Sequence, residues 1–201
     1  MGNSIIAFPG DYCVVDLETT GLNPEYNDII EIGAVMYSGG RETGRFQTLV
    51  RPPIRHDDGL YVDRFIENLT GITNEMLDSA PDPDTALWRF SRFLGDSIIL
   101  GYNVGFDVRF LKTAYARYLN AELTNDWIDI LRMARKLYPE MKHHRLCDMT
   151  EKFCITNTDA HRALADCLAT EECYSRLYDT AMWEYGSEEC FICTFNKKRR
   201  R

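Results

Sequence analysis

The fold is decided around residues 12–22, which contain the run Val14-Val15-Asp16-Leu17-Glu18-Thr19-Thr20-Gly21-Leu22. The first part of this stretch is short, apolar and β-branched, which predicts a buried strand over residues 12–17. Residues two apart on a strand share a face, so Asp16 and Glu18 are expected to point together from its end. Two such carboxylates repel, and a divalent cation would relieve the repulsion, because hard carboxylate oxygens suit Mg²⁺ or Mn²⁺. The plainer alternative is that one acid caps a turn while the other faces water.

Two more strands are predicted directly after this one. Residues 29–37 place Ile30, Ile32 and Ala34 on one strand face, and residues 44–50 form the third strand. Ser38-Gly39-Gly40, between them, is a hairpin signal. The three strands should therefore form an antiparallel meander.

The rest of the chain alternates helical and strand patterns. Helices are predicted over residues 61–69, 73–77, 84–94, 106–119, 131–138, 145–153 and 162–178, and short strands over 98–101 and 127–130. This order indicates an α/β fold with a mixed five-stranded sheet, three antiparallel strands followed by crossover strands, flanked by helices. We expect one domain over residues 1–180 and a C-terminal extension over 181–201 that ends in a basic tail.

A second polar cluster, Gly101-Tyr102-Asn103-Val104-Gly105-Phe106-Asp107, follows a predicted buried strand and opens a helix. Asp107 would lie in the first helical turn, where the helix dipole favours an anion. Capping alone would also explain an acid at this position. Ligands, however, collect at strand ends of open α/β sheets.

The third cluster is His161-Arg162-Ala163-Leu164-Ala165-Asp166. On one regular helix, a separation of five residues would place His161 and Asp166 roughly 140° apart. We therefore expect His161 on the loop before a helix and Asp166 about a turn and a half inside it. A surface hydrogen bond between the two is the alternative.

Composition limits the class of protein. The chain has 201 residues, 45% of them apolar, with 23 Lys and Arg against 31 Asp and Glu, which gives a net charge of −8. This indicates a globular protein and argues against nucleic-acid binding through overall basicity. Bases do gather locally, over residues 132–145 and in the tail over 197–201. No apolar run is long enough for a membrane span and no secretory leader is evident, so we expect a cytoplasmic protein without a membrane partner.

The seven cysteines have no compact paired framework, so we expect buried, reduced thiols. Cys190 and Cys193 have the spacing of half a zinc site, but no second half accompanies them. Apolar packing is the favoured role for this pair, ahead of zinc or redox chemistry.

Taken together, the three clusters resemble the DEDDh, or DnaQ-like, family of 3′→5′ exonucleases, which includes the proofreading subunit or domain of bacterial replicative polymerases. Asp16 and Glu18 match the first motif, Asp107 the second, and His161 with Asp166 the third. The resemblance covers roughly residues 10–178. The histidine of the third motif separates this chain from the branch that has a tyrosine there.

The resemblance implies an RNase H-like fold and phosphodiester hydrolysis with two Mg²⁺ or Mn²⁺ ions. The metal ligands would be Asp16, Glu18, Asp107 and Asp166, and His161 would act as general base. Cleavage would release nucleoside 5′-monophosphates from the 3′ end of a strand.

The same resemblance implies contacts to the terminal nucleotides. These substrate-binding residues are Thr19, Thr20, Leu22, Leu69, Asn103 and Phe106. Core packing is the alternative for the two leucines and the phenylalanine. DNA 3′ ends are the expected substrate, with RNA ends as an alternative, and a DNA polymerase subunit is a possible partner. A non-catalytic binding module is disfavoured because all five catalytic positions are intact.

Overall fold

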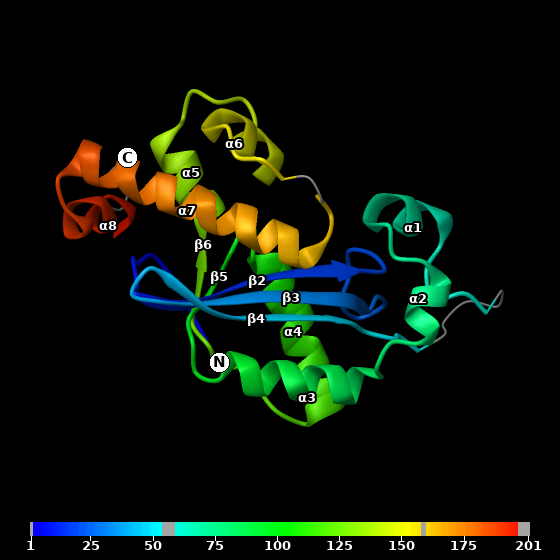
Figure 1. The fold of residues 1–201 in the computed structure, drawn as a ribbon. Helices are drawn as coiled ribbons and strands as arrows, with labels where there is room; N and C mark the ends of the chain where they lie inside the picture. Colours follow the sequence, from blue (N-terminus) through cyan, green and yellow to red (C-terminus); the bar gives the residue numbers. More distant parts are fainter. Residues whose placement is uncertain (1, 54–58, 158–159, 197–201) are drawn as a thin grey trace.

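The computed structural model describes residues 2–53, 59–157 and 160–196. At its centre is one six-stranded sheet with the strand order β1-β6-β5-β2-β3-β4 (Figure 1). The predicted basic tail over residues 197–201 lies outside the described residues.

The antiparallel half of the sheet has the predicted order. It consists of β2 (Asp11–Thr19), β3 (Ile29–Ser38) and β4 (Arg41–Leu49). β3 pairs antiparallel with both of its neighbours. The hairpin signal and the alternating apolar residues thus predicted this meander correctly.

The parallel half is added on the other side of β2. β5 (Ile99–Gly101) pairs parallel with β2, and β6 (Trp127–Asp129) pairs parallel with β5. A further strand, β1 (Ser4–Ile5), pairs parallel with β6, so the sheet has six strands and not the predicted five. A two-residue edge strand has no periodicity to detect, and only its pairing with β6 defines it.

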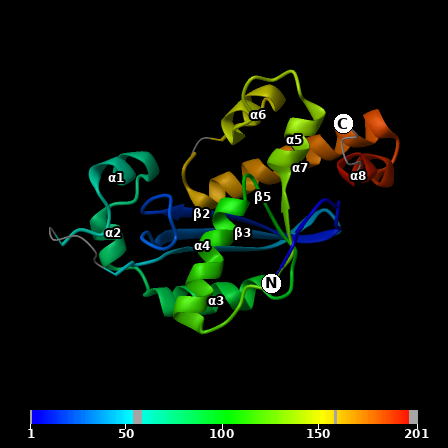
Figure 2. The same ribbon diagram turned by 180° about the vertical axis from the view of Figure 1, so that it is seen from behind.

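Helices cover both faces of the sheet (Figures 1 and 2). One face packs on α3 (Pro83–Leu94) and α4 (Gly105–Ala114), which continues as a π-helical segment over Tyr115–Leu119. The other face packs on α5 (Ile130–Leu137), α6 (Leu146–Phe153), α7 (Ala163–Tyr185) and α8 (Glu188–Asn196). Two short helices, α1 (Arg64–Thr70) and α2 (Asn74–Asp78), enclose a small apolar cluster of their own against Ile30.

The C-terminal part of the chain is helical beyond the last helix predicted from the sequence. Helix α7 extends to Tyr185, past the proposed domain boundary at residue 180, and α8 buries Phe191 completely in the core. The cysteine prediction holds for Cys13, Cys167 and Cys173, which are buried, but it is wrong for Cys147, Cys154, Cys190 and Cys193, which are exposed. In α8 it is Phe191, between the two cysteines, that packs inward. Among the described residues, no helix is both long and apolar enough to cross a membrane.

Candidate active site

Strand β2 carries the first pair of acids. Asp16 lies opposite Gly33 of β3, and Glu18 lies opposite Glu31. Alternation puts Asp16 and Glu18 on the face that α7 covers, together with Val14. Both side chains are half-buried near the end of the strand.

Asp107 reaches the same strand from helix α4. It is buried in the first turn of the helix, and its Oδ1 accepts a hydrogen bond of 3.2 Å from the backbone N–H of Leu17. Strand β5 pairs with β2 only at Cys13 and Val14, so the Leu17 amide lies beyond the end of β5. Asp107 satisfies this amide, which holds its carboxylate at the end of the strand.

The turn before α4 is held by Asp129, the last residue of β6. Asn103 adopts a left-handed backbone conformation with φ of 57°, and its N–H donates to Asp129 Oδ1 at 2.9 Å. The same oxygen caps helix α5 by accepting from the Leu131 N–H at 3.1 Å. Sequence reasoning missed Asp129, although it ends a strand that runs parallel to β5, with Gly101 as its register partner.

The third motif joins the cluster through the start of α7. His161 lies on the preceding loop with φ of 66°, and Asp166 lies in the first turn of the helix, slightly earlier than predicted. Asp166 Oδ2 accepts from the His161 backbone N–H at 3.2 Å, and its Oδ1 accepts from the Asn157 side-chain amide at 2.6 Å. Asp166 therefore fixes the loop that carries the histidine.

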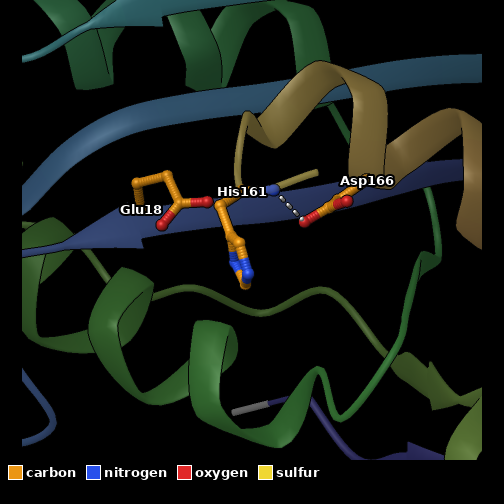
Figure 3. A group of neighbouring side chains, drawn as sticks. All are labelled: Glu18, His161 and Asp166. Carbon is orange, nitrogen blue, oxygen red and sulfur yellow. Dashed lines mark hydrogen bonds between the residues drawn. The ribbon is translucent and has the colours of Figure 1, made fainter. Parts of the chain in front are cut away.

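Three of the predicted residues meet closely enough to share an ion. One ligand atom from each of Glu18, His161 and Asp166 lies within 4.8 Å of the other two. Figure 3 shows the carboxylates of Glu18 and Asp166 on either side of His161, with the hydrogen bond from the His161 backbone to Asp166. The His161 side chain is exposed, so it is open to solvent and to a ligand.

Glu31 is a fifth acid at the site, and sequence reasoning missed it. It is completely buried, yet its two carboxylate oxygens accept from both the Nε and the Nη2 of Arg162, at 3.2 and 2.8 Å. It also accepts from the Ala163 N–H at 3.1 Å and from the Gln47 side chain at 2.9 Å. A charged residue within the apolar strand pattern of residues 29–35 was the signal that could have revealed it.

Helix α7 approaches the sheet closely at its first turn. A Cβ atom on Gly33 would lie 2.4 Å from the carbonyl carbon of Ala163, well inside van der Waals contact. Only a glycine therefore allows α7 to pack here, beside Asp16 on the neighbouring strand. The contact brings the His161 loop over the end of β2.

The acids at this end of the sheet perturb one another. Burial, followed by repulsion from Asp107, Asp166 and Glu18, raises the pKa of Asp16 well above its usual range. Burial and the neighbouring Asp166 raise the pKa of Glu18 to about 8. Burial raises the pKa of Asp107 to about 8 as well, although two backbone N–H groups act in the opposite direction.

Glu31 shows the opposite behaviour. Burial by itself would raise its pKa, but hydrogen bonds from Arg162, Gln47 and Ala163 lower it. The charge of Glu31 is thus balanced by Arg162. Within the described part of the chain, Asp16, Glu18 and Asp107 lack such a partner for their negative charge and lie near other acids. Repelling carboxylates near the end of one strand, of which Asp16 and Glu18 are half-buried and Asp107 is buried, suit a divalent cation.

The predicted substrate-binding residues lie at and after the end of β2, on α1 and around the start of α4. Leu22, on the loop after β2, is 81% exposed, and Leu69, on α1, is 42% exposed. These two leucines therefore are not core residues, while Phe106 is half-buried and packs on Phe110 with ring centroids 4.9 Å apart.

The two threonines make hydrogen bonds with the loop after β2. Thr19 donates its hydroxyl to the Gly21 carbonyl at 2.7 Å, and Thr20 accepts from the Asp28 N–H at 3.0 Å. Figures 1 and 2 place α1 at the end of the sheet where β2 finishes.

The strand order and the flanking helices define an RNase H-like fold, and comparison with known proteins identifies the family. Residues 13–174 match the family model described as "Exonuclease". The chain belongs to this exonuclease family, within its DnaQ-like group.

Two relatives show where in the family the chain falls. It is 34% identical over 177 residues to the DNA polymerase III subunit epsilon of Aquifex aeolicus, which covers 88% of this chain and 85% of that protein. It is 41% identical over 160 residues to the PolC-type DNA polymerase III of Bacillus subtilis, covering 79% of this chain but 11% of the much longer polymerase.

Solved structures agree on the fold. Exonuclease X, in complex with 5′-overhanging duplex DNA, superposes with a TM-score of 0.68 at 22% identity and covers 90% of this chain and 97% of that one. A 3′-exonuclease that recognises the histone mRNA stem-loop superposes with a TM-score of 0.69 at 23% identity, covering 89% and 67% of the two chains. At identities of 22% and 23%, these two comparisons show a shared fold alone.

Proposed function

We propose that this protein is a metal-dependent 3′→5′ exonuclease that removes nucleotides from DNA ends. The observation that carries the proposal is the meeting of Glu18, His161 and Asp166 at one point, near the half-buried carboxylate of Asp16 and the buried carboxylate of Asp107. Family membership supports the nuclease class, and the direction, substrate and metal requirement belong to the proposal.

Asp16, Glu18, Asp107 and Asp166 would hold two Mg²⁺ or Mn²⁺ ions. The raised pKa values of Asp16, Glu18 and Asp107 support this assignment, because charge repulsion makes the cluster favour added positive charge. When bound, such ions acidify a water molecule and stabilise the charge on a departing oxygen.

His161 would take the proton of the attacking water as general base. Its imidazole is exposed at the end of a loop that Asp166 holds through the backbone, so it can pass this proton on to solvent. Attack on the last phosphodiester releases a nucleoside 5′-monophosphate and leaves a new 3′-hydroxyl.

The residues around the cluster would hold the last nucleotides. We assign the terminal sugar and phosphate to Thr19, Thr20 and Asn103. The exposed leucines, Leu22 and Leu69, together with Phe106, would contact the bases. Apolar contact of this kind tolerates every base, as an exonuclease without sequence preference requires.

Polymerase relatives favour DNA over RNA as the substrate. The epsilon subunit and the PolC-type polymerase both carry the name DNA polymerase III, which supports a proofreading role in association with a DNA polymerase. A cytoplasmic location follows from that role and stays a prediction. The structural neighbour that recognises histone mRNA keeps RNA trimming as the second candidate.

A matched nuclease assay tests the proposal. Purified protein is incubated with 5′-labelled single-stranded DNA, duplex DNA and single-stranded RNA, with Mg²⁺ or with EDTA. We expect stepwise shortening from the 3′ end, fastest on single-stranded DNA, and none in EDTA. Asp16→Ala should abolish shortening without unfolding the protein, and His161→Gln should slow turnover by roughly 10²–10⁴-fold with little change in the Mg²⁺ requirement.

Glu184→Ala is the control, since Glu184 is an exposed acid towards the far end of the same helix as Asp166. Its activity should match that of the unaltered protein. Full activity in Asp16→Ala would refute the metal-site assignment, and faster shortening of RNA than of DNA would select the RNA-trimming alternative.

A further inference from the structure

The basic stretch over residues 132–145 is divided by the fold. It contains five bases and one acid, Glu140, in the sequence. Arg132 turns towards the N-terminus and donates to Ser4 Oγ at 2.8 Å. Arg135, Lys142 and Arg145 instead line a single groove. The groove is completed by Tyr102, Asn103, Leu131, His143, His144 and Leu146.

Internal hydrogen bonds fix the shape of this groove. The loop from α5 to α6 forms one wall, and the Tyr102 hydroxyl donates to the backbone carbonyl of His144 at 2.6 Å. The His144 ring nitrogen Nε2 is in turn 2.8 Å from the backbone oxygen of Tyr138. The wall that carries the bases is therefore tied both to the end of β5 and to the end of α5.

The groove has a marked charge. Its lining residues, all within the described ranges, include three bases and two histidines but no carboxylate. The Arg145 guanidinium already bonds Asp148 at 2.9 and 3.0 Å, so part of its charge is offset. Arg135 and Lys142 are exposed and provide most of the remaining positive charge. In a chain with a net charge of −8, this local concentration favours an anionic ligand.

The groove is continuous with the acidic cluster. Arg145 and Leu146 also line an adjacent hollow, whose other residues include Asn157, His161 and Asp166. On its other side the groove reaches Asn103, which begins the turn before Asp107. A polymer bound at His161 and Asp166 can therefore extend into the groove.

We propose that this basic groove binds the phosphate backbone of the nucleic-acid substrate, at phosphates other than the one that is cleaved. Arg135 and Lys142 provide the main contacts, and Arg145 joins the groove to the site of hydrolysis. The inference rests on the proposed nuclease function. It adds a binding site with a defined ligand, a run of phosphodiesters, which the acidic cluster alone would repel.

A binding experiment tests the groove separately from cleavage. The probe is a fluorescein-labelled single-stranded DNA of about twelve nucleotides, and its affinity is measured by anisotropy in EDTA between about 50 and 200 mM salt. The double variant Arg135→Glu/Lys142→Glu should bind about tenfold more weakly or worse. The slope of log affinity against log salt should become less steep by about 1.4. Each phosphate contact on a single strand contributes about 0.7 to this slope, and the variant loses two contacts.

A chemical control separates binding from hydrolysis. The p-nitrophenyl ester of thymidine 5′-monophosphate has one phosphodiester and cannot extend along the groove. Its hydrolysis with Mg²⁺ should be the same in the double variant and the unaltered protein. Arg89→Glu/Arg176→Glu is the matched variant, because it makes the same charge change at exposed arginines that do not line the groove, and it should bind DNA almost normally.

The outcomes distinguish the two proposals. Equal affinity and equal salt slope in the groove variant and the matched variant would overturn the groove assignment, even if the protein is an active nuclease. Loss of DNA binding confined to the groove variant, in a protein that hydrolyses neither substrate, would support the groove and reject the nuclease function. If the charge-reversed protein melts at a lower temperature, Arg135→Gln/Lys142→Gln repeats the test with a smaller change.

Discussion

At the scale of single residues, the hydrogen-bond partners of a buried acid decide its charge more than its degree of burial does. Glu18 and Glu31 are register partners on neighbouring strands, and burial acts on both. Glu31 accepts hydrogen bonds from Arg162, Ala163 and Gln47, and its pKa is lowered. Glu18 faces Asp166, and its pKa is raised to about 8. The two glutamates therefore have different uses: one anchors the fold, and the other is available to a cation.

The raised pKa values predict how stability depends on pH. A carboxyl whose pKa is higher in the folded than in the unfolded protein stabilises the fold below its unfolded value, and this stabilisation is lost as pH rises through the folded value. For Glu18 this window runs from 4.5 to about 8, and for Asp107 from 3.8 to about 8. The metal-free protein should therefore become less stable as pH rises from about 5 to 8.

Thermal melts in EDTA and in Mg²⁺ across this pH range provide the measurement. The midpoint in EDTA should fall with pH, and Mg²⁺ should reduce the fall because it binds the ionised carboxylates. In EDTA, Asp16→Asn should raise the melting temperature at pH 8, since it removes one repelling charge. A melting temperature in EDTA that rises steadily towards pH 8 would contradict the raised pKa values.

At the scale of elements, the start of α7 is the critical junction. It carries His161 on its preceding loop and Asp166 in its first turn, and the Glu31–Arg162 ion pair fixes it to β3. Gly33 allows the close approach of the two elements. The geometry of the third motif therefore depends on two residues of β3 that belong to none of the motifs.

Gly33→Ala should disturb this junction. The added methyl group would overlap the Ala163 backbone, so α7 must move, at a cost of about 1–3 kcal/mol in the free energy of unfolding. Nuclease activity should fall at the same time, because His161 and Asp166 move with the helix.

Gly10→Ala is the matched control, since a Cβ there has nothing within 4 Å. Urea denaturation and the oligonucleotide assay are measured on both variants. Equal stability and activity in the two would mean that the close packing at Gly33 is unimportant.

At the scale of the whole molecule, helix α8 closes the core on the face of the sheet that α7 covers. Phe191 of α8 is completely buried and packs with Phe8 near the N-terminus, with ring centroids 5.5 Å apart, and with Tyr185 of α7 at 5.2 Å. The division of the chain into a domain over residues 1–180 and an extension over 181–201 stays a prediction. The packing of Phe191 against Phe8 offers a way to test it. Phe191→Ala should cost about 3–5 kcal/mol in the free energy of unfolding, because it leaves a large cavity.

Cys193→Ala is the control within the same helix, since Cys193 is exposed and should change stability little. Denaturant unfolding measures both variants. If Phe191→Ala unfolds at the same denaturant concentration as Cys193→Ala, then α8 is an independent extension, as the domain prediction supposed.

Charge also has to be considered for the whole molecule. The net charge of −8 excludes binding by overall basicity, but it does not describe any single surface. The acids that matter most gather at the end of β2, and three bases line the groove beside them. Attraction of a polyanion depends on this arrangement, and the sum of the charges does not reveal it.

The sequence by itself determined the elements and the motif residues. Periodicity predicted β2, β3, β4 and most helices, because alternation and the 3.6-residue repeat are local properties of the chain. The three motifs indicated the RNase H-like fold and the family, both of which are confirmed. Strand β1 and helix α8 escaped prediction because their positions depend on contacts with distant residues.

Only the tertiary structure decided how those residues act together. The hydrogen bonds that Arg162 donates to Glu31 and that Asn103 donates to Asp129 join residues 131 and 26 positions apart, and no local pattern encodes them. The same holds for the groove, where Asn103 meets Arg135 and Lys142 from separate elements. A sequence records which side chains are available. Strand register and helix docking decide which of them meet, because packing energy depends on distances that only the folded chain defines.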